Sequence, residues 1–476
     1  MHFIIVGCGI GGISTAIGLV KKHVAASGGG TRGRGRRSPN AFPSPPPPFT
    51  ITLIDSLTYA GLLGTSSSGY DFSPSGVAAI FSLSPGDESV WTALRRASYK
   101  SDALIVEDAQ RSGKTAVLSL KLSDVPAYPR GTLTLTRSDF IRTLFNCLAA
   151  DYGYSSFPKQ VDRLTLDAPG LPTVRIILGD GLRRVRRWGN DRTHRQPVSV
   201  ELDSGRIVSG TVLIGADGVH SRIARLVQPS LGTDRMQQRQ VALWIRTEEA
   251  AHAPVPTSAP PLGTFVMATC DRAMVFYGRM VRDEVPDSRS NFIVVCFTHE
   301  EGMQSIPRGE RLDVLRQIIR ERHPRGASHL LASLAKARIE DVCGTNLYEP
   351  APGKMMKAAN RGSVVVIGDA LHPFTPFLGQ GASQALVDAD ALSTVLLAPN
   401  VAPTAALAAF SRARVGPTNK LVRESATMGS LMDRPRLSRA MHSAIRVLPA
   451  SYVARRFFSA DRACFPEAVR AEMFKQ

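Results

Sequence analysis

Three glycines near the start of the chain have the spacing of a phosphate-binding turn. Gly7, Gly9 and Gly12 form a GxGxxG pattern. In such a turn the first glycine permits a tight bend, the second lets the backbone approach a pyrophosphate, and the third lets a helix pack against a strand. Asp55, further along, could accept a hydrogen bond from a ribose hydroxyl. The pattern predicts a dinucleotide site, and the alternative is a glycine-rich turn between packed elements with Asp55 as a solvated acid.

The elements around these residues fit a dinucleotide fold. Residues 3–6 are apolar and predict a buried strand, and residues 13–20 predict a helix whose N-terminus would face the phosphates. Residues 49–55 predict a second strand that ends in the acid. The intervening residues 25–48 are rich in Gly, Arg, Ser and Pro, and we interpret them as an exposed insertion. Without that insertion, the distance from turn to acid approaches the roughly 20 residues that the fold expects.

A second group of residues lies about 360 positions later. Asp369 follows the apolar residues 364–367, where a carboxylate can bind a sugar-like hydroxyl. Gly379, Gln380 and Gly381 then present bare backbone N–H groups at the start of a helix predicted over residues 381–397. This arrangement stabilises an anion. It suits a flavin, whose N1–C2=O region becomes negative on reduction.

Three motifs together resemble one family. They are GCGIGG at residues 7–12, GADGVHSRIAR at 215–225 and GDALHPFTPFLGQGASQALVDADAL at 368–392. In this order they resemble the group A flavoprotein monooxygenases, the family of 4-hydroxybenzoate hydroxylase and salicylate hydroxylase, over roughly residues 1–400. The resemblance implies an α/β fold: a Rossmann-like, glutathione-reductase-type FAD-binding domain with an inserted, mainly antiparallel β-sheet substrate domain and a helical C-terminal segment.

The resemblance also assigns residues to FAD. By position, the expected cofactor-binding residues are Gly7, Gly9, Gly12, Asp55, Gly69, Arg137, Asp217, Gly218, Asp369, Gly379, Gly381 and Ala382. Arg137 could instead be an exposed arginine at a helix start, and Asp217 a structural turn acid. Val387 stands where family members often carry Glu, which leaves a polar role at that place open. His372 is expected to support the flavin rather than act as a base.

Candidate catalytic residues come from the middle of the chain. Residues 240–300 alternate as in an antiparallel sheet. Trp244, Ile245 and Arg246 resemble a segment that reaches the catalytic pocket in salicylate-hydroxylase-like members, and Tyr277 could face the same pocket. We therefore expect Arg246 and Tyr277 to be catalytic, with a sheet position pointing elsewhere as the alternative for each. No metal site is expected.

The chemistry implied by the family uses two nucleotides and dioxygen. NADPH or NADH would reduce bound FAD as a transient co-substrate, and O2 would form a C4a-hydroperoxyflavin that hydroxylates or epoxidises its substrate. An aromatic, polycyclic lipophilic or isoprenoid-like small molecule, such as a secondary metabolite, is expected, because aromatic side chains recur over residues 240–300. The alternatives are a flavin-dependent halogenase or reductase on the same scaffold, or a non-catalytic flavin-binding protein.

The motif order divides the chain into alternating segments. The expected division is residues 1–156 for the first part of the FAD-binding domain with the insertion at 25–48, 157–210 for strands of the substrate domain, 211–232 for the FAD-domain segment with the DG motif, 233–349 for the substrate sheet, 350–400 for the FAD-domain segment with the GD motif, and 401–476 for a helical, basic C-terminal segment.

Composition limits which classes of protein and of binding partner are compatible with the chain. Hydrophobic residues make up 43% of the 476 residues and charged residues 21%, as in a globular protein. Six scattered cysteines predict neither a disulfide framework nor a zinc site. No signal peptide or spanning segment of about 18 apolar residues is visible, so we expect a cytoplasmic protein. The net charge of +18 comes without a nucleic-acid-binding motif, so no nucleic acid is expected. The basic residues 438–458 could contact a membrane surface, or pack on the core.

Overall fold

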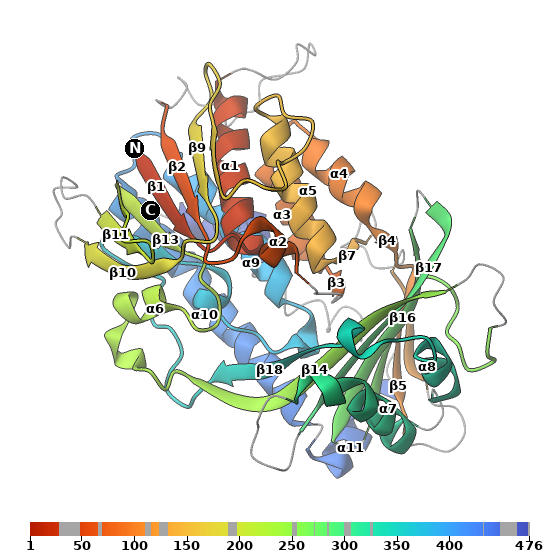
Figure 1. Ribbon diagram of the computed structural model, residues 1–476. Helices are drawn as coiled ribbons and strands as arrows, with labels where there is room; N and C mark the ends of the chain where they lie inside the picture. The colour runs from red at the N-terminus through yellow and green to blue at the C-terminus, as the bar shows by residue number, and fades with distance from the viewer. Residues whose placement is uncertain are drawn as a thin grey trace.

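Two large β-sheets form separate halves of the molecule, and helices cover both of them (Figure 1). The computed structural model describes residues 1–27, 48–64, 69–109, 116–122, 132–188, 198–249, 255–270, 272–282, 285–298, 306–323, 327–431, 433–447 and 464–474. Most of the insertion predicted at 25–48 lies outside the described residues. So does the second half of the basic segment 438–458.

The first sheet has a parallel centre. Its seven strands are, in spatial order, β19 (Asn360–Arg361), β20 (Val364–Val366), β13 (Val212–Gly215), β1 (His2–Val6), β2 (Thr50–Ile54), β9 (Thr173–Ile177) and β8 (Arg163–Leu166). The five inner strands run parallel, and the two edge strands are antiparallel to their neighbours. The inner strands are mainly apolar, and most of their side chains are buried, as expected for a parallel sheet that is covered on its faces.

The helices of this half pack against one another as well as on the sheet. They are α1 (Ile10–Ala26), α2 (Tyr59–Leu63), α3 (Pro74–Leu83), α4 (Ser89–Ala97), α5 (Arg137–Ala150), α6 (Arg222–Val227) and α9 (Gly381–Leu396). Small residues bring α1 and α9 close together, since a Cβ on Gly18 would lie 2.6 Å from the Ser393 hydroxyl. Lys22 completes this contact with a hydrogen-bonded ion pair of 2.7 Å to the buried Asp390.

The second sheet is mainly antiparallel. Its main path is β18 (Cys343–Pro350), β14 (Met236–Glu249), β17 (Val285–Phe297), β16 (Ala273–Arg282), β15 (Thr264–Cys270), β5 (Ala103–Asp108) and β6 (Ala116–Lys121), to which β3 (Gly69–Asp71), β4 (Tyr99–Lys100) and β7 (Thr134–Thr136) attach. The antiparallel run expected over residues 240–300 is present, but β5 was not foreseen and pairs with β15 in parallel. On one face, α7 (Arg311–Arg322) and α8 (Ala327–Ser333) cover a core of Val, Ile and Leu residues.

Two parts of the expected domain division need correction. Residues 157–210 were assigned to the substrate domain, yet β8 and β9 continue the parallel sheet, because β9 pairs with β2. The rest of that segment forms a separate three-stranded antiparallel sheet of β10 (Leu182–Arg187), β11 (Val198–Leu202) and β12 (Ile207–Gly210). Residues 1–156 were assigned to the FAD-binding domain, yet the strands β3 to β7 within them belong to the second sheet. The remaining boundaries stay a prediction.

The C-terminal part is helical. It contains α10 (Pro403–Ser430), α11 (Pro435–Val447) and α13 (Pro466–Met473), and short 3-10 turns elsewhere are η2 (Pro229–Leu231), η3 (Arg308–Glu310), η4 (Ile339–Asp341), η5 (Gly368–Ala370) and η6 (Pro376–Leu378). In the described ranges, no helix combines the length and the apolar character needed to cross a membrane. The mixed α/β fold expected from the sequence is confirmed.

Candidate active site

One cavity of about 1050 Å³ lies where the two halves meet. Its lining comes from the N-terminal glycine turn, from the loop around Asp369 and from the sheet that contains β14 and β16. Two segments about 360 residues apart in sequence therefore open onto the same space. An elongated molecule could contact both of them at once.

The glycine turn lines one end of this cavity. Gly7 has φ +102°, and a Cβ there would lie 2.2 Å from the Ala216 carbonyl oxygen. A Cβ on Gly12 would lie 1.8 Å from the Gly7 carbonyl oxygen, so α1 can approach the turn only without a side chain at this position. Gly9 lines the cavity, and a Cβ added there would meet no atom within 4 Å. The N-terminus of α1 has no side-chain cap, which leaves its backbone N–H groups available to an anion.

Asp55 lines the cavity beside the glycine turn, and its carboxylate also holds this turn in place. One carboxylate oxygen accepts a hydrogen bond of 2.6 Å from the Cys8 backbone N–H, and the other accepts one of 2.8 Å from the Leu57 N–H. A carboxylate has about four acceptor positions, so it can still bind a ligand hydroxyl.

Asp369 lies towards the other end, in η5 directly after β20. Its side chain is exposed to the cavity rather than packed, and burial of the site raises the pKa of its carboxyl, although His372 and Arg235 oppose that shift. Arg235 is buried and donates hydrogen bonds of 2.8 and 3.1 Å to the carbonyl oxygens of Ala370 and Leu371. The arginine thereby holds the loop that presents Asp369.

A fully buried ionic cluster also supports the loop around Asp369. The Asp388 carboxylate accepts hydrogen bonds from the Gly368 backbone N–H at 2.8 Å and from Arg414 Nε at 2.6 Å, and its Oδ2 lies 2.7 Å from His372 Nε2. Burial alone would raise the pKa of Asp388, but His372 and Arg414 outweigh it and lower the pKa below its ordinary value. The question left open at Val387 is thereby answered: Val387 is an apolar core residue, and Asp388 carries the polar role.

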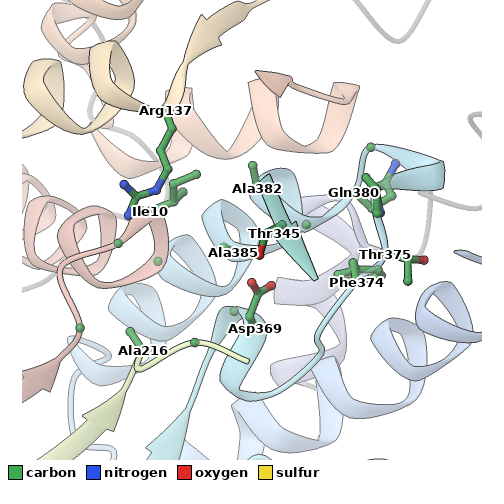
Figure 2. Close-up of a pocket in the computed structure, with 18 of the residues that line it drawn as sticks. Ile10, Arg137, Ala216, Thr345, Asp369, Phe374, Thr375, Gln380, Ala382 and Ala385 are labelled. Atoms are coloured by element: carbon green, nitrogen blue, oxygen red, sulfur yellow. The ribbon is translucent and has the colours of Figure 1, made fainter. Parts of the chain in front are cut away.

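A second uncapped helix N-terminus also opens onto the cavity. Gly379 adopts a left-handed conformation with φ +60°, and α9 starts at Gly381 without a side-chain cap. Gly379, Gln380, Gly381 and Ala382 all line the cavity. Figure 2 shows Asp369 pointing towards Thr345 and towards α9.

Arg137 and Gly69 are also placed at the cavity. Arg137 is the first residue of α5 and donates a hydrogen bond of 2.7 Å to the Leu62 carbonyl oxygen, while its guanidinium extends towards Ile10 at the start of α1 (Figure 2). A Cβ on Gly69 would lie 3.2 Å from the Phe292 ring, so a larger residue would press on the second sheet.

Asp217 and Gly218 line the cavity near the glycine turn, but Asp217 mainly organises its own segment. Its carboxylate accepts hydrogen bonds from the Ser221 hydroxyl at 2.5 Å and from the Arg222 backbone N–H at 2.9 Å, where α6 begins. Burial raises the pKa of Asp217, and these hydrogen bonds oppose the shift. These hydrogen bonds agree with the alternative that Asp217 is a structural turn acid. A direct contact of Asp217 with FAD stays a prediction.

The structure does not bring Arg246 and Tyr277 to the cavity. Tyr277 lies on the opposite face of the sheet, where its hydroxyl donates a hydrogen bond of 2.8 Å to Glu107 and its ring contacts His323. Arg246 extends along the cavity face beyond Trp244 but donates a hydrogen bond of 2.6 Å to the Tyr99 hydroxyl. The expected pocket position of both residues is therefore corrected.

The sheet side of the cavity is apolar. Trp244 lines it as expected, and so does Phe276, the neighbour of Tyr277 on the other face. The apolar side chains that the second sheet contributes to the cavity are Leu104, Ala242, Trp244, Phe265, Met267, Phe276, Val294 and Leu347. Such a lining binds a lipophilic ring system and excludes water.

The residues present fit a flavin dinucleotide. The N-terminal turn has no room for a side chain at Gly7 or Gly12, and the second turn has Gly379 in a left-handed conformation. With two uncapped helix N-termini and the carboxylates of Asp55 and Asp369 on the same cavity, these turns match the pyrophosphate, the sugar hydroxyls and the electron-accepting ring of such a molecule. Gly12 differs from the other predicted residues because it serves the packing of α1 and does not line the cavity.

Sequence reasoning missed Arg235, Asp388 and Arg414. All three are buried charged side chains that support the loop around Asp369 rather than contact the cavity. The only available signal was the pair of acids in the VDAD segment of an otherwise apolar helix, because a buried acid requires a partner.

Comparison with known proteins gives consistent matches. A family model described as "FAD binding domain" matches residues 182–425. The FAD-dependent monooxygenase pynG of Aspergillus niger is 28% identical over 219 residues, which cover 44% of this chain and 49% of that protein. The FAD-dependent monooxygenase ausM of Penicillium brasilianum is 27% identical over 227 residues, 44% of this chain and 43% of that protein. The matches thus span about half the length of these curated relatives.

Solved structures share the fold over nearly the whole chain. HpxO of Klebsiella pneumoniae, solved with FAD and uric acid, has a TM-score of 0.71 at 18% identity and covers 97% of both chains. CtdE, solved with FAD and a substrate, has a TM-score of 0.66 at 15% identity and covers 99% of this chain and all of that one. At these identities the likeness concerns the fold.

Proposed function

Because the chain belongs to the FAD-binding domain family of group A flavoprotein monooxygenases, we propose that it is an FAD-dependent monooxygenase that uses NAD(P)H and O2 to oxygenate a lipophilic, ring-containing small molecule. Family membership also confirms FAD as the expected cofactor. The substrate, the source of electrons and the oxygenation itself are parts of the proposal.

The continuity of the cavity supports this proposal best. The same space contacts Gly9 and Asp55, continues past Asp369 and Gly381, and ends at the apolar sheet around Trp244. A protein that only stores a nucleotide needs the first part. A monooxygenase needs the last part as well, since its substrate must lie beside the flavin ring and away from water.

Each group of residues has a definite task in such a reaction. When bound, FAD supplies the redox chemistry that passes electrons from NAD(P)H to O2 and one oxygen atom to the substrate. The N-termini of α1 and α9 would bind the pyrophosphate and stabilise negative charge on the ring. Asp55 and Asp369 would bind sugar hydroxyls, and Arg235 and Asp388 would keep the Asp369 loop in place.

The apolar sheet would position the substrate and exclude water. Trp244, Phe265 and Phe276 provide flat ring surfaces, which suit aromatic or polycyclic substrates. An aromatic or isoprenoid-like substrate therefore stays the proposed class. Contact with a membrane through the basic C-terminal segment also stays a prediction, for which α11 is the described part.

Oxygen incorporation tests the proposal directly. Purified, FAD-loaded protein would be screened for compounds that stimulate NADH or NADPH oxidation, and the products would be analysed by mass spectrometry under ¹⁸O2. The proposed activity requires a product that contains one ¹⁸O atom. Reduction or halogenation of the substrate without ¹⁸O, or hydrogen peroxide as the sole product with every stimulating compound, would exclude it.

The cofactor assignment has a separate test. Asp369→Ala is expected to lower the flavin content of the purified protein at least tenfold, because it removes a hydrogen bond from a charged group to the cofactor. Asp313→Ala is the matched control, since Asp313 lies on α7 with 78% of its side chain exposed. Equal flavin content in both variants would contradict the role of Asp369.

A further inference from the structure

Asp71 is an acid in the cavity to which the FAD-binding pattern assigns no role. It is the last residue of β3 and lines the cavity together with Phe72 and Ser73. The Ser73 backbone N–H donates a hydrogen bond of 2.9 Å to the hydroxyl of Ser383 on α9, which ties this segment to the start of that helix. Asp71 thus lies between the α9 loop and the apolar sheet.

The register of the strands determines which way the Asp71 side chain faces. Asp71 is opposite Thr134 in the β3–β7 pair, and Thr134 is in turn opposite Tyr99 of β4. Paired residues lie on the same face of a sheet. This is the face of Tyr99 and Phe292, which pack edge to face, whereas the neighbouring Leu135 belongs to the core of the other half.

One of the two carboxylate oxygens of Asp71 is available. Oδ1 accepts a hydrogen bond from the Thr134 hydroxyl. Oδ2 has no hydrogen-bond or ion-pair partner within the described part of the chain, and no charged group contributes to the energetics of this carboxyl. Burial raises its pKa to about 6, with the Thr134 hydrogen bond opposing the shift.

The charged and titratable groups on the surrounding elements are engaged with other partners. Arg137 of α5 bonds to a backbone carbonyl, Arg246 of β14 bonds to the Tyr99 hydroxyl, and Arg282 of β16 forms an ion pair of 2.7 Å with Asp139. None of the described cavity-lining residues of β5 or of β14 to β18 is ionisable. Asp71 is therefore positioned to supply a charged acceptor to a molecule lying on the apolar sheet.

The geometry points to Asp71 as the substrate-facing proton acceptor of this cavity, whose carboxylate first accepts a hydrogen bond and then a proton from an acidic O–H group of the substrate. This inference rests on the proposed function and deepens it. In the step, the substrate O–H bond breaks, an Oδ2–H bond forms, and the electron pair stays on the substrate oxygen. The ring carbons conjugated to that oxygen become more electron-rich, which favours attack on the oxygen atom that O2 and NAD(P)H supply. The proton returns to the product or to water before the next turnover.

The test compares Asp71→Asn with Asp102→Asn in FAD-loaded protein. The asparagine at position 71 keeps an acceptor for the Thr134 hydroxyl, so the fold and the flavin content are expected to be retained. Asp102 is a matched control because it lies close by, has 54% of its side chain exposed and does not line the cavity. Flavin content, measured first, reports on the cofactor site and separates a failure there from a failure of this inference.

The first readout is a pH titration of the absorption spectrum of the bound flavin. Wild type and Asp102→Asn are expected to show a step near pH 6, and Asp71→Asn is expected to lack it. Thr134→Val is expected to move the step to higher pH, because it removes the hydrogen bond that lowers the pKa of Asp71.

The second readout compares the binding of 1-naphthol and naphthalene, which differ only in the hydroxyl group. Flavin fluorescence gives both affinities. Wild type is expected to bind 1-naphthol about tenfold more tightly than naphthalene, because the hydroxyl donates a hydrogen bond to a charged acceptor. Asp71→Asn is expected to lose most of that preference. The inference is overturned if wild type shows no step between pH 5 and pH 7, if Asp71→Asn keeps the step, or if both proteins have the same preference. All three results leave oxygen incorporation, and thus the proposed function, to be decided separately.

Discussion

Replacement of Asp388 by Asn tests whether the buried cluster holds the Asp369 loop. The Asp388 carboxylate accepts from the Gly368 N–H and from Arg414, and lies at hydrogen-bond distance from His372. The side chains of Asp388, His372 and Arg414 are all completely buried. Asparagine offers a single acceptor oxygen, and its NH2 group would face a donor. The Arg414 guanidinium would also lose its counter-charge without gaining contact with water.

The expected cost follows from these contacts. Hydrogen bonds to charged groups contribute about 1.5–3 kcal/mol each, and at least two of them would be lost. Removing one partner of a buried ion pair typically costs about 3–5 kcal/mol. We therefore expect Asp388→Asn to lower the free energy of unfolding by about 3–5 kcal/mol. Because the cluster anchors the Gly368 N–H, the flavin content should fall as well.

Urea unfolding of the FAD-free protein measures this change, followed by tryptophan fluorescence and by circular dichroism. Asp313→Asn is the control, for which a change of at most about 1 kcal/mol is expected because its ion pair is exposed. The difference between wild type and Asp388→Asn should narrow as the pH falls. The pKa of Asp388 is lowered in the folded state, so its stabilising effect is present above the ordinary carboxyl range and is lost as the pH drops through the folded-state pKa. A change below about 1 kcal/mol at neutral pH would refute the reasoning.

Three further outcomes are expected. Gly12→Ala should abolish flavin binding, measured as flavin absorbance per protein, since its Cβ would lie 1.8 Å from the Gly7 carbonyl oxygen; a normal flavin content would show that α1 can shift without cost. In FAD-free protein, Asp71→Asn should be more stable than wild type by about 3 kcal/mol at pH 7, because the folded-state pKa of Asp71 is about 6 against an ordinary value of 3.8. The gain should vanish below pH 4, where Asp71 is protonated in both the folded and the unfolded form. Urea unfolding at pH 7 and below pH 4 measures the stability difference between variant and wild type, and the same difference at both pH values would contradict the reasoning. Trp244→Ala should weaken 1-naphthol binding about tenfold in a fluorescence titration while leaving flavin content unchanged, since it removes ring contact on the sheet side only; a parallel loss of flavin would show that this side chain supports the cofactor instead.

The sequence was sufficient for the parts of the site whose geometry is local. A strand, a glycine turn and a helix must follow one another closely, so Gly7, Gly9 and the uncapped start of α1 could be placed from their spacing alone. Asp55 became recognisable once residues 25–48 were set aside, and it does lie beside the turn in the structure. Each of these inferences depends on residues that are neighbours along the chain.

The faces of the second sheet could not be assigned in this way. Alternation shows that Phe276 and Tyr277 point to opposite sides, but it does not show which side holds the cavity. That choice depends on α7 and α8, which cover the Tyr277 face and turn it into a core. The same limit applies to β9, because its apolar pattern suits either sheet and only the pairing with β2 decides.

The distance between the two glycine turns is set by a helix interface rather than by either loop. At its start α9 carries the Gly381 loop, and further along it carries Asp388, which holds the Gly368 N–H. Two residues later, Asp390 pairs with Lys22 of α1, the helix that begins at the other glycine turn. A single helix therefore fixes Asp369, its supporting cluster and the N-terminal turn relative to one another. Two motifs about 360 residues apart can form one cofactor site because α1 and α9 pack through small residues at a fixed separation.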